Sequence, residues 1–117
     1  MREIIFYLTD SGNCPVKEFL DSLTGKQAQK VAWVLKVVEE LEMIPKQYMK
    51  KLVGTDDIWE IRVQYANDII RILGFFDDGN LVVLNHGFFK KTQKTPKQDI
   101  IISEKRKKDY LRRKHNE

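Results

Sequence analysis

Residues 58–95, IWEIRVQYANDIIRILGFFDDGNLVVLNHGFFKKTQKT, carry the strongest secondary-structure pattern of the chain. Three runs rich in Val, Ile, Phe and Trp are separated by two turn signals, Tyr65–Asp68 and Asp77–Asn80. β-Branched and aromatic residues favour strands, whereas Asn, Asp and Gly favour the tight turns that join antiparallel strands. The segment therefore predicts a three-stranded antiparallel meander.

The two turns determine which residues lie opposite one another. A two-residue loop in the second turn places Arg71 opposite His86, and a similar loop in the first turn places Arg62 opposite Arg71. Because side chains alternate across a strand, Arg62, Arg71 and His86 then form one row on one face, with Lys90 on the same side. A shift of two residues at the first turn would leave Arg62 on this face, whereas a shift of one residue there would move it to the opposite face.

The two faces of this meander differ in polarity. The face expected to cover the core is almost wholly apolar and carries Trp59, Ile61, Val63, Ile70, Ile72, Phe76, Leu81 and Val83. The second face carries Leu73, Phe75 and Leu84, with a polar group gathered towards one end: Glu60, Arg62, Gln64, Arg71, His86 and Lys90. Two arginines directly opposite each other repel unless an anion lies close by. A bound phosphate would supply that anion, and so would Glu60 or another carboxylate in an ordinary ion-pair network.

Length and composition limit the class of protein. The 117 residues predict one domain, residues 1–117, with a modest core, and the 42% hydrophobic content is ordinary for a globular protein. The single cysteine, Cys14, excludes an intramolecular disulfide and a cysteine-rich zinc site, and two histidines are too few to indicate a metal centre. No cofactor motif is present, and no apolar run approaches membrane-spanning length, so we expect a cytoplasmic location.

The net charge of +4 is modest, but the basic residues are clustered. The three groups are Lys46, Lys50 and Lys51; Lys90, Lys91, Lys94 and Lys97; and the segment Lys105–Lys114. Such groups favour an anionic partner, either nucleic acid or an acidic protein, although any one of them alone also fits an ordinary solvated surface.

The rest of the chain predicts one more strand and three helices. The strand is Glu3–Leu8, expected to join the meander. The first helix starts at Cys14-Pro15, and the second runs from a capping box at Thr24 and Gln27 to about Met43. Lys46–Asp57 is expected to be a loop, and the final helix spans Lys97 to about Arg113. The prediction is an α+β domain whose two early helices pack on the apolar face of a small antiparallel sheet.

This element order, with the runs IWEIR, IIRILGFFDDGN and HGFFKKTQKTP, resembles the RelE/ParE toxin superfamily and, within it, the HigB-like, phage-derived group. The resemblance covers nearly the whole chain and implies a RelE-like fold. It implies the toxin of a type II toxin-antitoxin pair, with a helix-turn-helix antitoxin as partner and contact with DNA only through that antitoxin. It also implies a metal-independent endoribonuclease that cuts mRNA on the ribosome.

The resemblance assigns roles to particular residues. The phosphate-contacting arginine of the family's middle strand falls on Arg71, the basic residue of the preceding strand on Arg62, and that at the end of the last strand on Lys90 or Lys91. Flanking phosphates would be held by Lys50, Lys51, Lys91 and Lys94. Some members use a tyrosine, or a histidine with an aspartate, as acid or base. No tyrosine lies in residues 90–96, and His86 is the remaining candidate.

Three other functions fit the same pattern. A ParE-like inhibitor of DNA gyrase would share the fold and would not depend on Arg71. A non-enzymatic module would bind a helix-turn-helix partner without arresting growth. A plain nucleic-acid-binding domain would bind in a strongly salt-dependent way without cleavage.

Overall fold

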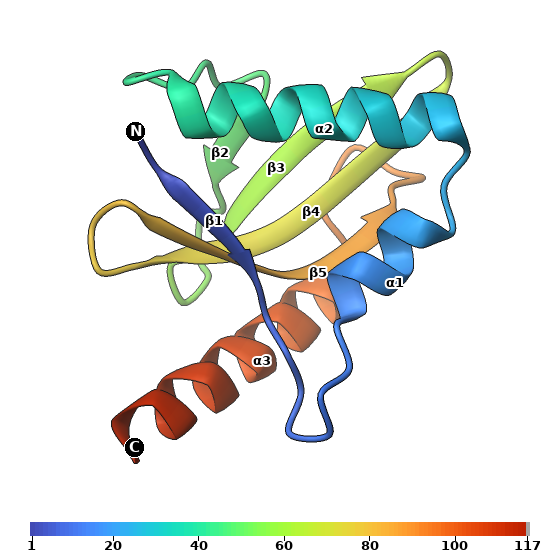
Figure 1. Ribbon diagram of the computed structural model, residues 1–117. Coiled ribbons are helices and arrows are strands. Elements are labelled where there is room, and N and C mark those ends of the chain that lie inside the picture. Colours follow the sequence, from blue (N-terminus) through green and yellow to red (C-terminus); the bar gives the residue numbers. More distant parts are fainter. Residues whose placement is uncertain (117) are drawn as a thin grey trace.

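The computed structural model describes residues 1–116 and shows an α+β fold with three helices and one mixed, open five-stranded sheet (Figure 1). The strands are β1 (Glu3–Phe6), β2 (Met49–Lys51), β3 (Trp59–Tyr65), β4 (Asp68–Asp77) and β5 (Leu81–Phe89). The helices are α1 (Pro15–Asp21), α2 (Gly25–Glu40) and α3 (Lys97–His115). The sheet order is β1-β5-β4-β3-β2, in which β1 runs parallel to β5 and the other pairs are antiparallel. The α+β class and the central meander are therefore confirmed. The prediction of an antiparallel sheet is wrong, because β1 joins the sheet parallel to β5, and β1 ends at Phe6 and not at Leu8.

The fifth strand, β2, is a correction to the sequence prediction, which treated Lys46–Asp57 as a loop. Residues Met49–Lys51 pair with β3, and Lys50 lies opposite Glu60. Met49 is 3% exposed and contributes to the core. A run of three residues, two of them lysines, gives no alternating pattern, so only the pairing with β3 makes it a strand.

Helices α1 and α2 cover one face of the sheet, as predicted. The capping box that opens α2 is present: Gln27 N–H donates to Thr24 Oγ1, and Thr24 N–H donates to Gln27 Oε1. One stripe of α2, formed by Val31, Val34 and Val38, is buried against the sheet.

Helix α2 ends at Glu40, about three residues earlier than expected. Leu41 is extended there, and the Arg2 guanidinium donates hydrogen bonds to the carbonyl of Val38 in the last turn and to that of Glu42 after it. The bond to Val38 satisfies a carbonyl group that a longer helix would have used internally.

The predicted register of β5 is wrong. Arg71 lies opposite Phe88, and His86 lies opposite Leu73, because the turn holds three residues, 78–80, and a bulge follows between Leu73 and Gly74. The extra residue in the turn reverses the first half of β5. Leu84, with Val82, packs into the α1–α2 core, whereas Val83, with Leu81, packs beside Phe75 on the other face.

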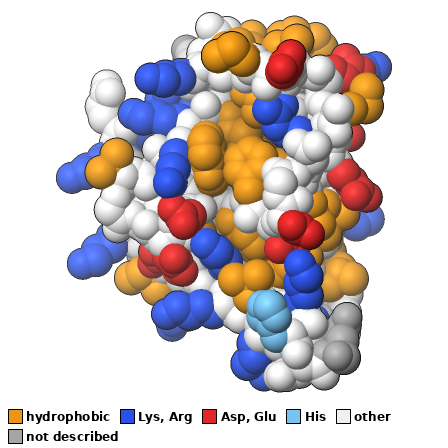
Figure 2. All heavy atoms as spheres, turned by 90° about the vertical axis from the view of Figure 1, so that its left-hand side faces the viewer, with side chains coloured by type: hydrophobic (Ala, Val, Ile, Leu, Met, Phe, Trp, Pro, Cys, Tyr) orange, Lys and Arg blue, Asp and Glu red, His pale blue; other side chains and the backbone are white. Residues whose placement is uncertain are grey.

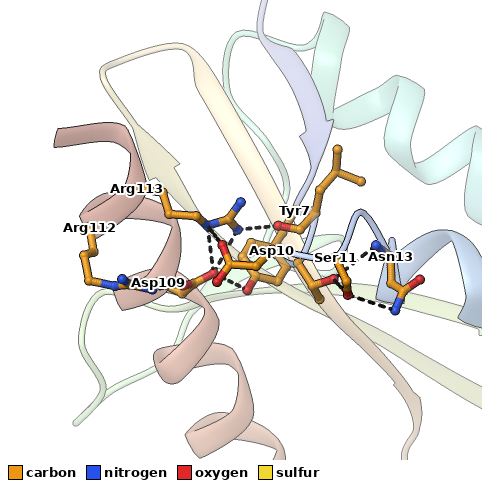
Figure 3. Close-up of polar contacts among 9 residues, drawn as sticks. Tyr7, Asp10, Ser11, Asn13, Asp109, Arg112 and Arg113 are labelled. Carbon is orange, nitrogen blue, oxygen red and sulfur yellow. Dashed lines mark hydrogen bonds and ion pairs between the residues drawn. The ribbon is translucent and has the colours of Figure 1, made fainter. Parts of the chain in front are cut away.

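Helix α3 covers only part of this second face, mainly over β4 and β5. Tyr110 of α3 packs edge to face against Phe75 of β4, with ring centroids 5.5 Å apart. Its C-terminal half is joined to the segment after β1 by Asp109, which accepts hydrogen bonds from Tyr7 Oη at 2.6 Å and Arg113 Nε at 3.0 Å (Figure 3). Polar side chains occupy the part of this sheet face near the N-terminal end of α3.

Charges of both signs are mixed at the β4–β5 turn end of the molecule. That end faces the viewer in Figure 2, where acidic and basic side chains surround a central hydrophobic area. The surface there has no single sign of charge. The predicted cationic residues belong to the opposite end of β4, near the β3–β4 turn.

Candidate functional site

Arg62 and Arg71 lie directly opposite each other on β3 and β4, as the first turn predicted. Their side chains are 34% and 9% exposed, respectively. Positive φ at Ala66, 54°, allows the tight β3–β4 turn that fixes this register. The pair places two guanidinium groups side by side at the uncovered part of the sheet.

Glu60 lies between these arginines, and this is the ion-pair arrangement that the sequence left open. Glu60 Oε1 is 3.6 Å from Arg62 Nε and 3.5 Å from Arg71 Nε, and the other carboxylate oxygen accepts a hydrogen bond from the Thr95 hydroxyl. Both ion pairs are long, and Arg71 Nε is buried without a hydrogen-bond partner among residues 1–116. A single carboxylate therefore neutralises only part of the local positive charge.

Lys90 is the third cation of this group, which we call the cationic cluster: Arg62, Arg71 and Lys90. Its backbone N–H continues the sheet by donating to Ile69 O at 2.8 Å, and only 8% of the residue is exposed. Burial lowers the pKa of the Lys90 ammonium, and Arg71, Arg62 and Lys50 lower it further against the opposing effect of Glu60. Burial, with repulsion from Arg62, likewise lowers the pKa of Arg71.

Three hollows meet at the cationic cluster. One of about 290 Å³ is bordered by Glu60, Arg62 and Lys90, one of about 320 Å³ by all three members of the cluster, and one of about 230 Å³ by Arg62 and Arg71. Because Arg62 borders all three, the guanidinium groups are reachable from several directions. The site can accept an anionic group that is part of a longer chain.

The flanking lysines differ in their availability. Lys50, Lys91 and Lys94 are exposed and border the same hollows, whereas the Lys51 ammonium is 2.9 Å from Asp57. Strand β2 brings Lys50 to the cluster by placing it opposite Glu60. Gln93 and Thr95, which the sequence prediction did not select, border the 290 Å³ hollow together with Lys94. Both residues lie next to Lys94 in the run HGFFKKTQKTP, and this position in the sequence could have indicated that they belong to the site.

His86 does not join the cluster in the predicted way. Its Nε2 is 2.7 Å from Asp99 Oδ1, and Arg106 Nη1 is 3.3 Å from its Nδ1. A donor at Nδ1 requires that nitrogen to be unprotonated, so Nε2 carries the proton that Asp99 accepts. Burial lowers the pKa of His86 and outweighs the attraction of Asp99, while Arg106 lowers it further. His86 therefore links β5 to α3 as a neutral imidazole.

Within residues 1–116, no group of three or more His, Cys, Asp or Glu side chains is arranged to hold a metal ion. Over the same residues, no helix is both long enough and apolar enough to cross a membrane. The chemistry of the cationic cluster is instead that of an anion site, since guanidinium and ammonium groups donate hydrogen bonds and repel metal cations.

Comparison with known proteins identifies the family. No curated protein matches the chain. The model of the family described as phage derived protein Gp49-like (DUF891) matches residues 18–108, which include both arginines, Lys90 and most of the sheet. That match covers well over half of the 117 residues. The chain therefore belongs to the Gp49-like family of phage-derived proteins, a family associated with RelE-like toxins of toxin-antitoxin systems.

Proposed function

We propose that this protein is a HigB-like toxin of a type II toxin-antitoxin pair and that it cuts mRNA on the ribosome. The observation that carries the proposal is the cationic cluster, in which Arg62, Arg71 and Lys90 exceed the single carboxylate Glu60 at the meeting point of three hollows. The family's association with toxins supports the biological role. The location is proposed to be the cytoplasm, where translating ribosomes are found.

The proposed reaction transfers an RNA phosphodiester to its own 2′-hydroxyl. The 2′-oxygen bonds to phosphorus, the bond to the 5′-oxygen of the next nucleotide breaks, and the products are a 2′,3′-cyclic phosphate and a 5′-hydroxyl. Arg62 and Arg71 would hold the non-bridging oxygens as planar donor groups and stabilise the charge that develops on them. The reaction as written uses no metal ion.

Two protons must move, one from the 2′-hydroxyl and one to the leaving oxygen. Lys90 is proposed to supply the second, because its lowered pKa makes proton loss easier than for an exposed lysine. Glu60 is proposed to accept the first, since it borders the 290 Å³ hollow and no other carboxylate among residues 1–116 borders any of the three hollows. His86 is not given this role, because Asp99 and Arg106 occupy its two ring nitrogens.

The ribosome would position the mRNA for this small site, which has few groups to position it. Positioning of a reacting group contributes as much to rate as acid or base groups, and a bound mRNA held by the ribosome is already fixed. Lys50, Lys51, Lys91 and Lys94 are proposed to contact the flanking phosphates. A helix-turn-helix antitoxin is the proposed protein partner, and any contact with DNA would be made through it.

The test is primer extension on a defined mRNA with and without translating ribosomes. Wild type is expected to produce cuts only with ribosomes, and Arg62→Ala and Arg71→Ala are expected to abolish them. Arg62→Ala guards against misfolding, since Arg62 is partly exposed, and Lys36→Ala on α2 is the control because its side chain is 70% exposed on the opposite side of the sheet.

Several outcomes would contradict the proposal. Naked RNA cut as fast as ribosome-bound mRNA would remove the ribosome dependence. Growth arrest that persists in Arg71→Ala without any RNA cuts would favour the gyrase inhibitor, and binding of a helix-turn-helix partner without growth arrest would favour the non-enzymatic module.

A further inference from the structure

We propose that the 290 Å³ hollow beside the cationic cluster binds a nucleobase of the RNA strand whose phosphate is held by Arg62 and Lys90. This inference rests on the proposed function and names the part of the substrate that the hollow would receive. Part of its lining is cationic and shared with the cluster, through Arg62 and Lys90, with Lys50 beside them. Its aliphatic lining consists of Leu52, Val53 and Ile100.

The aliphatic side is not explained by the packing of the fold. Val53 is 94% exposed, so its side chain contributes almost nothing to the core. Leu52 and Ile100 are only partly buried next to it. Apolar surface in water is unfavourable by about 25 cal/mol per Å² relative to burial, so a flat apolar group placed here would bind favourably.

The loop that presents Val53 is held in place by its own bonds and by α3. Thr55 Oγ1 donates to Leu52 O at 2.8 Å and accepts from Ile58 N–H at 3.1 Å. Asp56 N–H donates to Glu104 Oε2 at 2.9 Å, and Lys107 Nζ donates to Asp56 O at 2.6 Å. Because these bonds fix the loop before any ligand arrives, the wall is preorganised and little ordering is required on binding.

The hollow has three chemical features, and a nucleotide carries a group that complements each of them. Its phosphate matches the cations, its base matches the aliphatic wall, and its base edge carries both donors and acceptors. Gln93 supplies an exposed carboxamide with the same two functions at the rim, and this amide has no hydrogen bond within residues 1–116. The Asp and Glu side chains of an acidic peptide would satisfy the cations but have no rigid flat group for the wall formed by Leu52 and Val53.

The experiment compares the affinities of adenosine 5′-monophosphate and ribose 5-phosphate by calorimetry at low salt. Wild type is expected to bind the nucleotide more tightly, because only the nucleotide carries a base. Val53→Ser is expected to weaken nucleotide binding about fivefold, which corresponds to about 1 kcal/mol, and to leave ribose 5-phosphate unchanged. Val53→Leu keeps the apolar wall and is expected to retain the wild-type affinity.

Met43→Ser is the matched control, since Met43 is 86% exposed and lies outside the hollow. Both exposed positions can change without disturbing the core. Equal affinities for the two ligands in wild type, or equal loss in Val53→Ser and Met43→Ser, would overturn the nucleobase site. If the nucleobase site is overturned but ribosome-dependent RNA cleavage is still observed, the proposed function stands. If no cleavage is observed but Val53→Ser selectively lowers the affinity for the nucleotide, the proposed function alone is refuted.

Discussion

Replacing Glu60 by glutamine should reduce stability and increase anion affinity at the same time. The change removes the one carboxylate between two arginines while keeping an acceptor for the Thr95 hydroxyl. At an effective dielectric constant of about 20, a charge pair at the 3.5 Å of Glu60 and Arg71 attracts with about 5 kcal/mol. Desolvation of the carboxylate offsets part of this energy, and loss of one partner from a buried pair typically costs about 3–5 kcal/mol.

We therefore expect Glu60→Gln to lower the free energy of unfolding by about 3 kcal/mol, the lower end of that range, because Arg62 remains partly solvated. For a chain of this length the corresponding fall in Tm is about 12 °C. The measurement is thermal unfolding followed by circular dichroism, in a buffer of low ionic strength without multivalent anions.

Phosphate then distinguishes an anion site from a purely structural network. A ligand that binds only the folded state raises stability by about 2.7 kcal/mol at 100 times its Kd. Because Glu60 repels a bound anion, phosphate should raise the Tm of Glu60→Gln more than that of wild type. Glu42→Gln, at an exposed residue without an ion pair among residues 1–116, is the control. A Glu60→Gln variant that keeps the wild-type Tm, or that gains no more from phosphate than wild type, would refute this reasoning.

Two further predictions concern the polar and backbone contacts that surround the site. Gly74→Ala should lower stability by about 1–3 kcal/mol, because a Cβ would lie 2.2 Å from the Val83 carbonyl oxygen at the β-bulge, whereas Gly25→Ala has open space and should cause no loss; equal midpoints in urea would contradict this. Burial lowers the pKa of His86 from its ordinary 6.5, so the folded state binds fewer protons than the unfolded chain as the pH falls below about 6.5. The contribution of neutral His86 to the free energy of unfolding is therefore complete above that pH and declines below it. His86→Gln should flatten the profile of unfolding free energy below about pH 6.5, and an unchanged slope would show that His86 does not titrate there.

The sequence predicted those features that depend on local pattern. The capping box at Thr24 and Gln27 is fixed by residues three positions apart, and the Arg62–Arg71 pair is fixed by one tight turn. Both were predicted correctly because the residues involved are close to one another in the sequence. The side of the sheet on which Arg62, Arg71 and Lys90 lie follows from the same alternation.

The features that were wrong or missed depend on contacts between distant segments. The register of β5 differs by one extra residue in the turn and by the bulge, and both places contact distant segments: Asn80 O accepts a hydrogen bond from Glu3 N–H in β1, and Asn85 is hydrogen-bonded to Ser103 in α3. Strand β2 exists only because β3 offers it an edge. No local pattern contains this information.

The sequence by itself determined the α+β class, the meander and the pairing of two arginines, since these follow from residue type and short-range geometry. Only the packing of distant segments places Glu60 between the arginines, brings Asp99 and Arg106 to His86, and puts Lys50 and Val53 at the same hollow. The physical reason is that side-chain contacts across elements depend on register and docking, which a shift of one residue reverses.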